Sequence, residues 1–151
     1  MVKLALGDIM INNKEMLASI LKTTQMGQIG IRTVQDSAQS QEMKQALADQ
    51  LREYNSIETE ARTLAGHRGW KLEDLNPGIR TMSEILAHMK LMGGNRDSKI
   101  ASMVIQGNTK GMIIGLKNAH RHKDQDGNVT ALVNKLLEFE NANIRQMESF
   151  L

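Results

Sequence analysis

Residues 129–151, VTALVNKLLEFENANIRQMESFL, contain the pattern that decides the fold. Large apolar side chains recur at helical spacing, which predicts one continuous amphipathic helix. Glu140 falls at the centre of the apolar stripe, where a charged side chain is unusual. Similar stripes at about 14–36, 41–66 and 98–122 predict three further long helices. The stripe of the last helix comprises Val129, Leu132, Val133, Leu136, Leu137, Ile144, Met147 and Leu151.

The composition agrees with an all-α chain. One proline and only four aromatic residues, among 151, argue against an all-β fold, whereas eleven methionines suit helices that pack on helices. The absence of cysteine excludes disulfides, thiolate metal sites and cysteine nucleophiles. We therefore expect one domain over residues 1–151 with a substantial apolar core.

The order of the expected elements resembles two antiparallel helical hairpins joined by a long crossover. Residues 1–11 form an N-terminal arm, and residues 67–95 form the crossover, which contains a short amphipathic helix of its own. One long crossover between two hairpins is typical of ferritin-like four-helix bundles. The expected boundary signals are Asn12 capping the first helix, Gly66 closing the second, Asn76-Pro77 starting the short helix, Gly93-Gly94 ending it, and Asp97 or Ser98 capping the third.

Charge and targeting signals are weak. A net charge of +2 gives no electrostatic reason to expect a nucleic acid or membrane partner. The N-terminal MVKLALGDIMI is broken by Gly7 and Asp8, so it does not resemble a signal peptide. We expect a soluble, cytoplasmic protein.

Three segments carry a family resemblance: LADQLREYNSIETEARTL (47–64), IASMVIQGNTKGM (100–112) and LLEFENANIRQMESFL (136–151). With them, nearly the whole chain resembles an uncharacterised bacterial branch of the ferritin-like superfamily. The resemblance implies a four-helix bundle with rubrerythrin- or ferritin-type topology. In active relatives it also implies a di-iron or di-manganese site.

The residues that would ligate such metals are incomplete in this sequence. The usual site takes a Glu from each of two helices and a Glu-x-x-His pair from each of the other two. Glu140 is followed by Asn143 where His is expected, and Glu58 is followed by Ala61. We therefore predict a degenerate site and no bound cofactor; in the alternative, Glu58 and Glu140 hold iron or manganese with substitute ligands.

The remaining polar core positions suggest a structural role. A buried polar group needs hydrogen-bond partners, so side chains that share the core are expected to bond to one another. We predict one hydrogen-bonded network across the bundle, formed by Thr24, Gln28, Tyr54, Glu58, Glu140 and Asn143.

The third long helix has two further features. Gly107, Gly111 and Gly115 recur every four residues, which predicts close packing of another helix or a large side chain. Ile105, Met112 and Leu116 form a second apolar stripe, away from the core. This stripe predicts a homodimer in which two copies of the helix pack antiparallel, unless the crossover helix covers it.

Three functions remain open at this point. The first is a non-catalytic structural or interaction protein with an unknown protein partner. The second is a metal-binding oxidoreductase or metal-storage protein with atypical ligands. The third is a small-ligand binder that uses space left by the glycines in the middle of the bundle.

Overall fold

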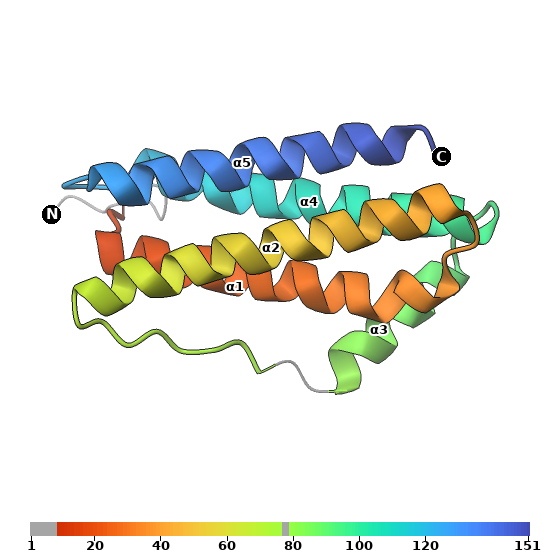
Figure 1. The fold of residues 1–151 in the computed structure, drawn as a ribbon, viewed down its shortest axis with the longest axis horizontal. Coiled ribbons are helices and arrows are strands. Elements are labelled where there is room, and N and C mark those ends of the chain that lie inside the picture. Colours follow the sequence, from red (N-terminus) through yellow and green to blue (C-terminus); the bar gives the residue numbers. More distant parts are fainter. Residues whose placement is uncertain (1–8, 77–78) are drawn as a thin grey trace, which may run out of the picture.

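The computed structural model describes residues 9–76 and 79–151, and in these residues it contains five α-helices, a short 3-10 helix and no β-strand. The all-α prediction is therefore confirmed. Figure 1 shows four long helices side by side and a shorter helix at one end. The elements are α1 (Asn13–Val34), η2 (the 3-10 helix, Gln35–Ser37), α2 (Gln41–His67), α3 (Ile79–Lys90), α4 (Arg96–Arg121) and α5 (Gly127–Glu148).

Side chains just before each long helix set its first residue. Asn12 accepts a hydrogen bond from the backbone amide of Glu15, whose carboxylate accepts one from the amide of Asn12. This reciprocal pair is a capping box, and it confirms the prediction that Asn12 caps the first helix. Ser40 caps α2 by accepting from the amide of Met43. These two helix starts lie within one residue of the positions expected from the sequence.

Two other helix starts differ from the prediction, because a cap residue precedes the expected one. Asn95, rather than Asp97 or Ser98, caps α4 by accepting from the amide of Ser98. Asp97 lies in the first turn and instead accepts from two backbone amides just before α2, at 2.7 and 3.0 Å. Asp126 caps α5, which begins at residue 127 rather than at residue 129.

Contacts between helix ends fix the direction of each helix. Asp97, at the start of α4, binds the chain just before α2, and Arg68, just after α2, forms an ion pair with Asp126 at the start of α5. Ile11, before α1, forms a parallel bridge with His122, directly after α4. Each of α1 and α5 is therefore antiparallel to both α2 and α4. The most extensive packing joins α1 to α2 and α4 to α5, as expected for two hairpins.

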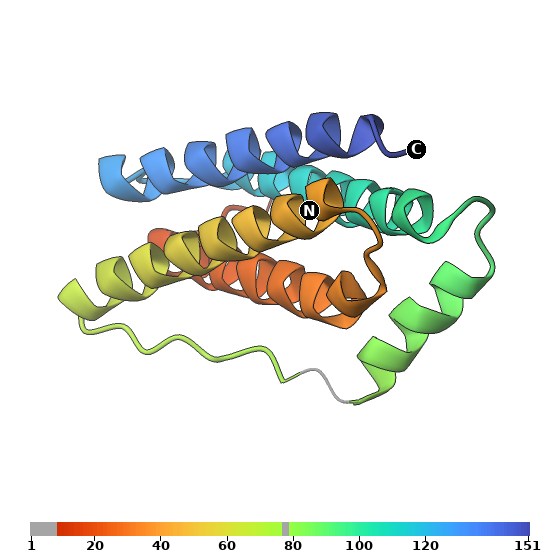
Figure 2. The ribbon, with the colours of Figure 1, turned by 45° about the vertical axis from the view of Figure 1, so that its right-hand side comes forward.

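The crossover between the hairpins runs along the outside of the bundle (Figure 1). The chain leaves α2 at Gly69, whose φ of +69° favours glycine, and not at Gly66, which is still helical. Pro77, expected to start the short helix, lies outside the described residues. Figure 2 shows α3 inclined to the four long helices at one end of the bundle, where Met89 is buried.

The core lies between the four long helices, and most predicted stripe residues are buried in it. Ile114 is an exception: it is part of the apolar pattern that predicts the third long helix, but its side chain is 40% exposed. Within the described residues, no helix combines the length and apolarity needed to cross a lipid bilayer.

Candidate functional site

Among the buried polar side chains, four from three helices lie together in the centre of the bundle. They are Tyr54 of α2, Asn108 of α4, and Glu140 and Asn143 of α5, each at most 4% exposed. Burial of polar groups to this extent requires partners within the protein. The helices bring these side chains to the core because each lies on the apolar stripe of its own helix.

Asn108 is the centre of this cluster. Its Oδ1 accepts hydrogen bonds from the hydroxyl of Tyr54 at 3.0 Å and from Nδ2 of Asn143 at 3.2 Å. Its own Nδ2 donates to the carbonyl of Val104 at 2.8 Å. The amide of Asn108 thus links α2 to α5 across the bundle.

Asn108 is not among the polar core residues predicted from the sequence, which instead predicts close packing at Gly107. The signal was present, because Asn108 continues the spacing of Ile100 and Val104 at intervals of four residues. Gly107 is exposed, and nothing lies within 4 Å of the place that its Cβ would take. The predicted close packing at Gly107 is therefore wrong.

Close packing does occur at the other two glycines of α4. The carboxylate of Glu140 occupies the space that a Cβ on Gly111 would need, and Cδ2 of Leu137 lies 2.8 Å from the corresponding position on Gly115. The ring of Tyr54 likewise occupies the space that a Cβ on Gly27 would need, a contact that was not predicted from the sequence. That ring also packs edge-on against Phe139, with centroids 4.7 Å apart. Side chains thus fill the space beside Gly111 and Gly115, two of the three glycines where the sequence allowed a ligand cavity.

No Lys, Arg or His side chain of the described residues forms an ion pair with Glu140. Its side chain is 1% exposed, and its Oε1 has no hydrogen-bond partner among the described residues. Burial raises the pKa of Glu140 to about 8, so the carboxyl group is mostly protonated at neutral pH. Burial also raises the pKa of Tyr54. The negative charge that Glu140 carries once it is ionised raises the pKa of Tyr54 further.

A second polar cluster lies at the edge of the bundle, between α1 and α2. Nε2 of Gln28 donates to Oε1 of Glu58 at 2.8 Å, and Nε of Arg62 donates to Oε2 at 3.2 Å. Arg62 also pairs with Asp74 of the crossover, which accepts from Nε2 of Gln25 at 2.9 Å. This cluster holds the crossover against the first hairpin.

The predicted single network is therefore wrong, because its six members fall into three groups. Tyr54 and Asn143 meet at Asn108, with Glu140 beside them, whereas Gln28 and Glu58 meet at the edge. Thr24, although fully buried, satisfies its hydroxyl on the carbonyl of Leu21 in its own helix. An intrahelical bond of this kind needs no partner on another helix.

The donor set does not fit the di-metal site that the family resemblance implies. Glu140 is the one carboxylate in the central cluster, and Glu58 is already bonded to Gln28 and Arg62. Within the described chain, no group of three or more His, Asp and Glu side chains could hold a metal ion. Asn108 and Asn143 offer amide groups, which are poor replacements for the imidazoles of an iron site.

The predicted dimer face on α4 is partly covered. Ile105 and Met112 are half-buried, and Leu116 is 49% exposed. The neighbouring Ile113, which is not part of the predicted stripe, is 50% exposed. The exposed apolar surface of α4 is therefore centred closer to Ile113 than the predicted stripe is.

No protein-family model matches this chain, and no curated protein gives a significant match. Among solved structures, the chain is similar to the crystal structure of a conserved hypothetical protein, rv2844, from Mycobacterium tuberculosis. The two share 10% sequence identity with a TM-score of 0.72, over 92% of this chain and 96% of that one. At this identity the likeness concerns the fold alone.

Proposed function

We propose that this chain is a non-catalytic structural or interaction protein of the ferritin-like class, with a degenerate di-metal site. The order and directions of the helices support the class, because two antiparallel hairpins joined by one long crossover are typical of ferritin-like bundles. The class by itself does not define an activity.

The observation that carries the proposal is the bonding of the central cluster. In a metal-binding bundle, inward-facing side chains converge on the ion. Here Tyr54, Asn108 and Asn143 bond to one another, and Glu140 packs over Gly111. A direct hydrogen bond from α2 to α4 gives the helices a fixed register, which is the best-attested use of buried polar groups.

Metal analysis of the untagged protein tests the proposal. After incubation with Fe²⁺ or Mn²⁺ and desalting, we expect wild type and Glu140→Gln to retain the same substoichiometric amount of metal. Glu140→Gln is a suitable partner variant because it resembles the protonated side chain in shape. Stoichiometric metal in wild type that is lost in Glu140→Gln would overturn the proposal in favour of a metal-binding oxidoreductase or storage protein.

A further inference from the structure

We propose that the solvent-facing side of α4 binds an amphipathic helix of a partner protein that carries acidic residues. This inference deepens the proposed function by naming the chemistry of the partner. Its test is independent of metal content, so either proposal can fail while the other stands.

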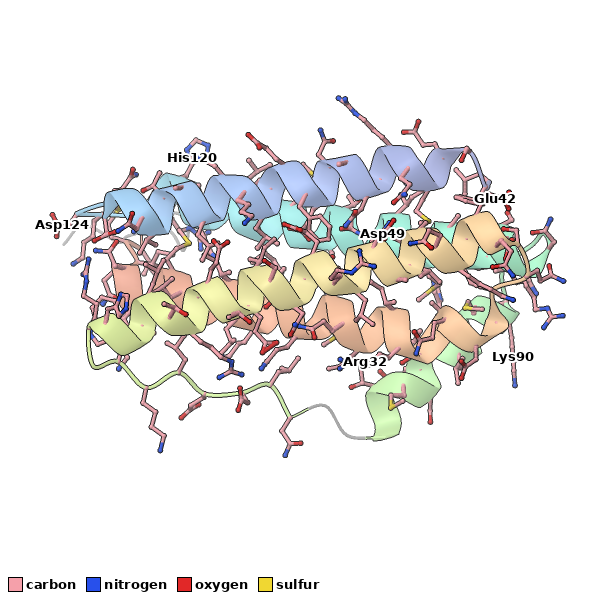
Figure 3. The ribbon with its side chains drawn as sticks, in the orientation of Figure 1. Arg32, Glu42, Asp49, Lys90, His120 and Asp124 are labelled. Carbon is pink, nitrogen blue, oxygen red and sulfur yellow. The ribbon has the colours of Figure 1, made fainter. Side chains whose placement is uncertain are left out.

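The first observation is a cluster of exposed apolar side chains in the C-terminal half of α4. Ile113, Ile114 and Leu116 lie within one turn of α4, and their side chains are 50%, 40% and 49% exposed. At about 100° per residue, Ile113 lies about 180° from the buried Val104, so it points directly away from the core. His120, one turn beyond Leu116, also points away from the bundle (Figure 3). Clusters of large apolar side chains on such a face mark interaction sites.

The second observation is a row of cations beside the apolar side chains. α4 contains five Lys or Arg residues and one acidic residue, Asp97, which binds backbone amides at the start of α2. Lys110 and Lys117 are exposed and lie one turn before and one turn after Ile113. The cationic side chains of α4 are Arg96, Lys99, Lys110, Lys117 and Arg121.

Within the described chain, ion pairs neutralise some cations elsewhere in the molecule, whereas others, such as Lys22 and Lys44, are as unpaired as those of α4. Arg52, Arg62, Arg68 and Lys135 each form an ion pair with a carboxylate. Among the residues that the structure describes, the cations of α4 have no such partner within 4.0 Å, the limit for an ion pair. A surface that combines unpaired cations with apolar side chains is complementary to one that combines carboxylates with apolar side chains.

Charge favours a different protein over a second copy of this chain. In the predicted antiparallel dimer, the two-fold axis would place the cationic rows of both α4 helices on the same side of the interface. The two rows would therefore face each other. Facing like charges weaken association. A partner helix with a row of Glu or Asp beside a row of Leu or Ile would meet both features of α4, in the manner of helix-in-groove recognition.

The test uses a synthetic helical peptide of about three heptads with adjacent Leu and Glu rows. We expect saturable binding by fluorescence anisotropy, and no binding of the same peptide with Lys in place of Glu. Lys110→Glu/Lys117→Glu should weaken binding at least about tenfold, and higher salt should weaken it further. Ile113→Gln/Leu116→Gln should weaken it by a similar factor.

A matched control separates local complementarity from net charge. Lys22→Glu/Lys44→Glu changes the charge by the same amount at exposed positions of α1 and α2, and should leave the affinity unchanged. Circular dichroism confirms that every variant is folded. The proposal is overturned if the acidic peptide does not bind at about 100 μM, if the control weakens binding equally, or if both peptides bind alike.

Two other occupants of this face give different results. A wild-type dimer in sedimentation that Ile113→Gln/Leu116→Gln dissociates would overturn the proposal in favour of a second copy. Binding to phosphatidylserine vesicles without binding to the acidic peptide would overturn it in favour of an anionic membrane surface.

Discussion

Glu58 lies at the edge of the bundle and pairs with Arg62, whereas Glu140 lies at its centre and forms no ion pair with any residue that the structure describes. Glu58 accepts hydrogen bonds from Gln28 and Arg62, and its side chain is 17% exposed. Glu140 is 1% exposed, has an oxygen without a partner and carries a raised pKa. The two glutamates thus lie in different surroundings, and their carboxyl groups belong to separate clusters.

The largest expected effect comes from filling the space beneath Glu140. Gly111→Leu should lower the free energy of unfolding by at least about 3 kcal/mol, because the new side chain must displace a buried carboxyl group. Gly107→Leu is the matched control, since open space surrounds Gly107 on the same helix. It should be neutral or stabilising by up to about 1 kcal/mol. Urea unfolding measures the free energy of unfolding of both variants. Similar losses of stability in the two would contradict the close packing of Glu140 against Gly111.

The next effect is a pH dependence specific to the central carboxyl group. Between the ordinary pKa of 4.5 and the folded value of about 8, the folded protein holds a proton that the unfolded chain has released. The free energy of unfolding therefore falls as the pH rises through this window, by about 2 kcal/mol between pH 6 and pH 8.

Glu140→Gln should remove this contribution, so the difference in stability between wild type and variant should change with pH. Urea titrations at pH 6, 7 and 8 measure it. A constant difference over this range would show that the carboxyl group is not protonated in the fold, and would weaken the contrast with Glu58.

The smallest effect is expected at the edge of the bundle. Arg62→Ala should cost at most about 1 kcal/mol, because the side chain of Arg62 is 42% exposed and solvent screens its pairs with Glu58 and Asp74. Hydrogen exchange of the crossover backbone should increase, since Asp74 joins this segment to both α1 and α2. If Arg62→Ala lowered the free energy of unfolding as much as Gly111→Leu, the edge cluster would not be solvated.

The positions of the long helices could be predicted from the sequence because apolar spacing and cap residues act locally. The capping box at Asn12 and the burial of Glu140 both followed from residues a few positions away. The prediction failed by small shifts of phase, as at Gly107 against Asn108, where neighbouring positions on one helix differ by about 100°. A shift of one residue moved the predicted contact from the core to solvent.

The all-α class and the helix boundaries, to within a few residues, could therefore be predicted from the sequence. The pairing of polar side chains between helices could not, because it depends on the folded arrangement. Tyr54 and Asn108 are 54 positions apart in the sequence, and Arg62 pairs with Asp74, which is 12 positions away in the crossover. Such pairings depend on how whole helices rotate and approach one another. That geometry is set by the sum of many packing contacts, and no local pattern of residues encodes it.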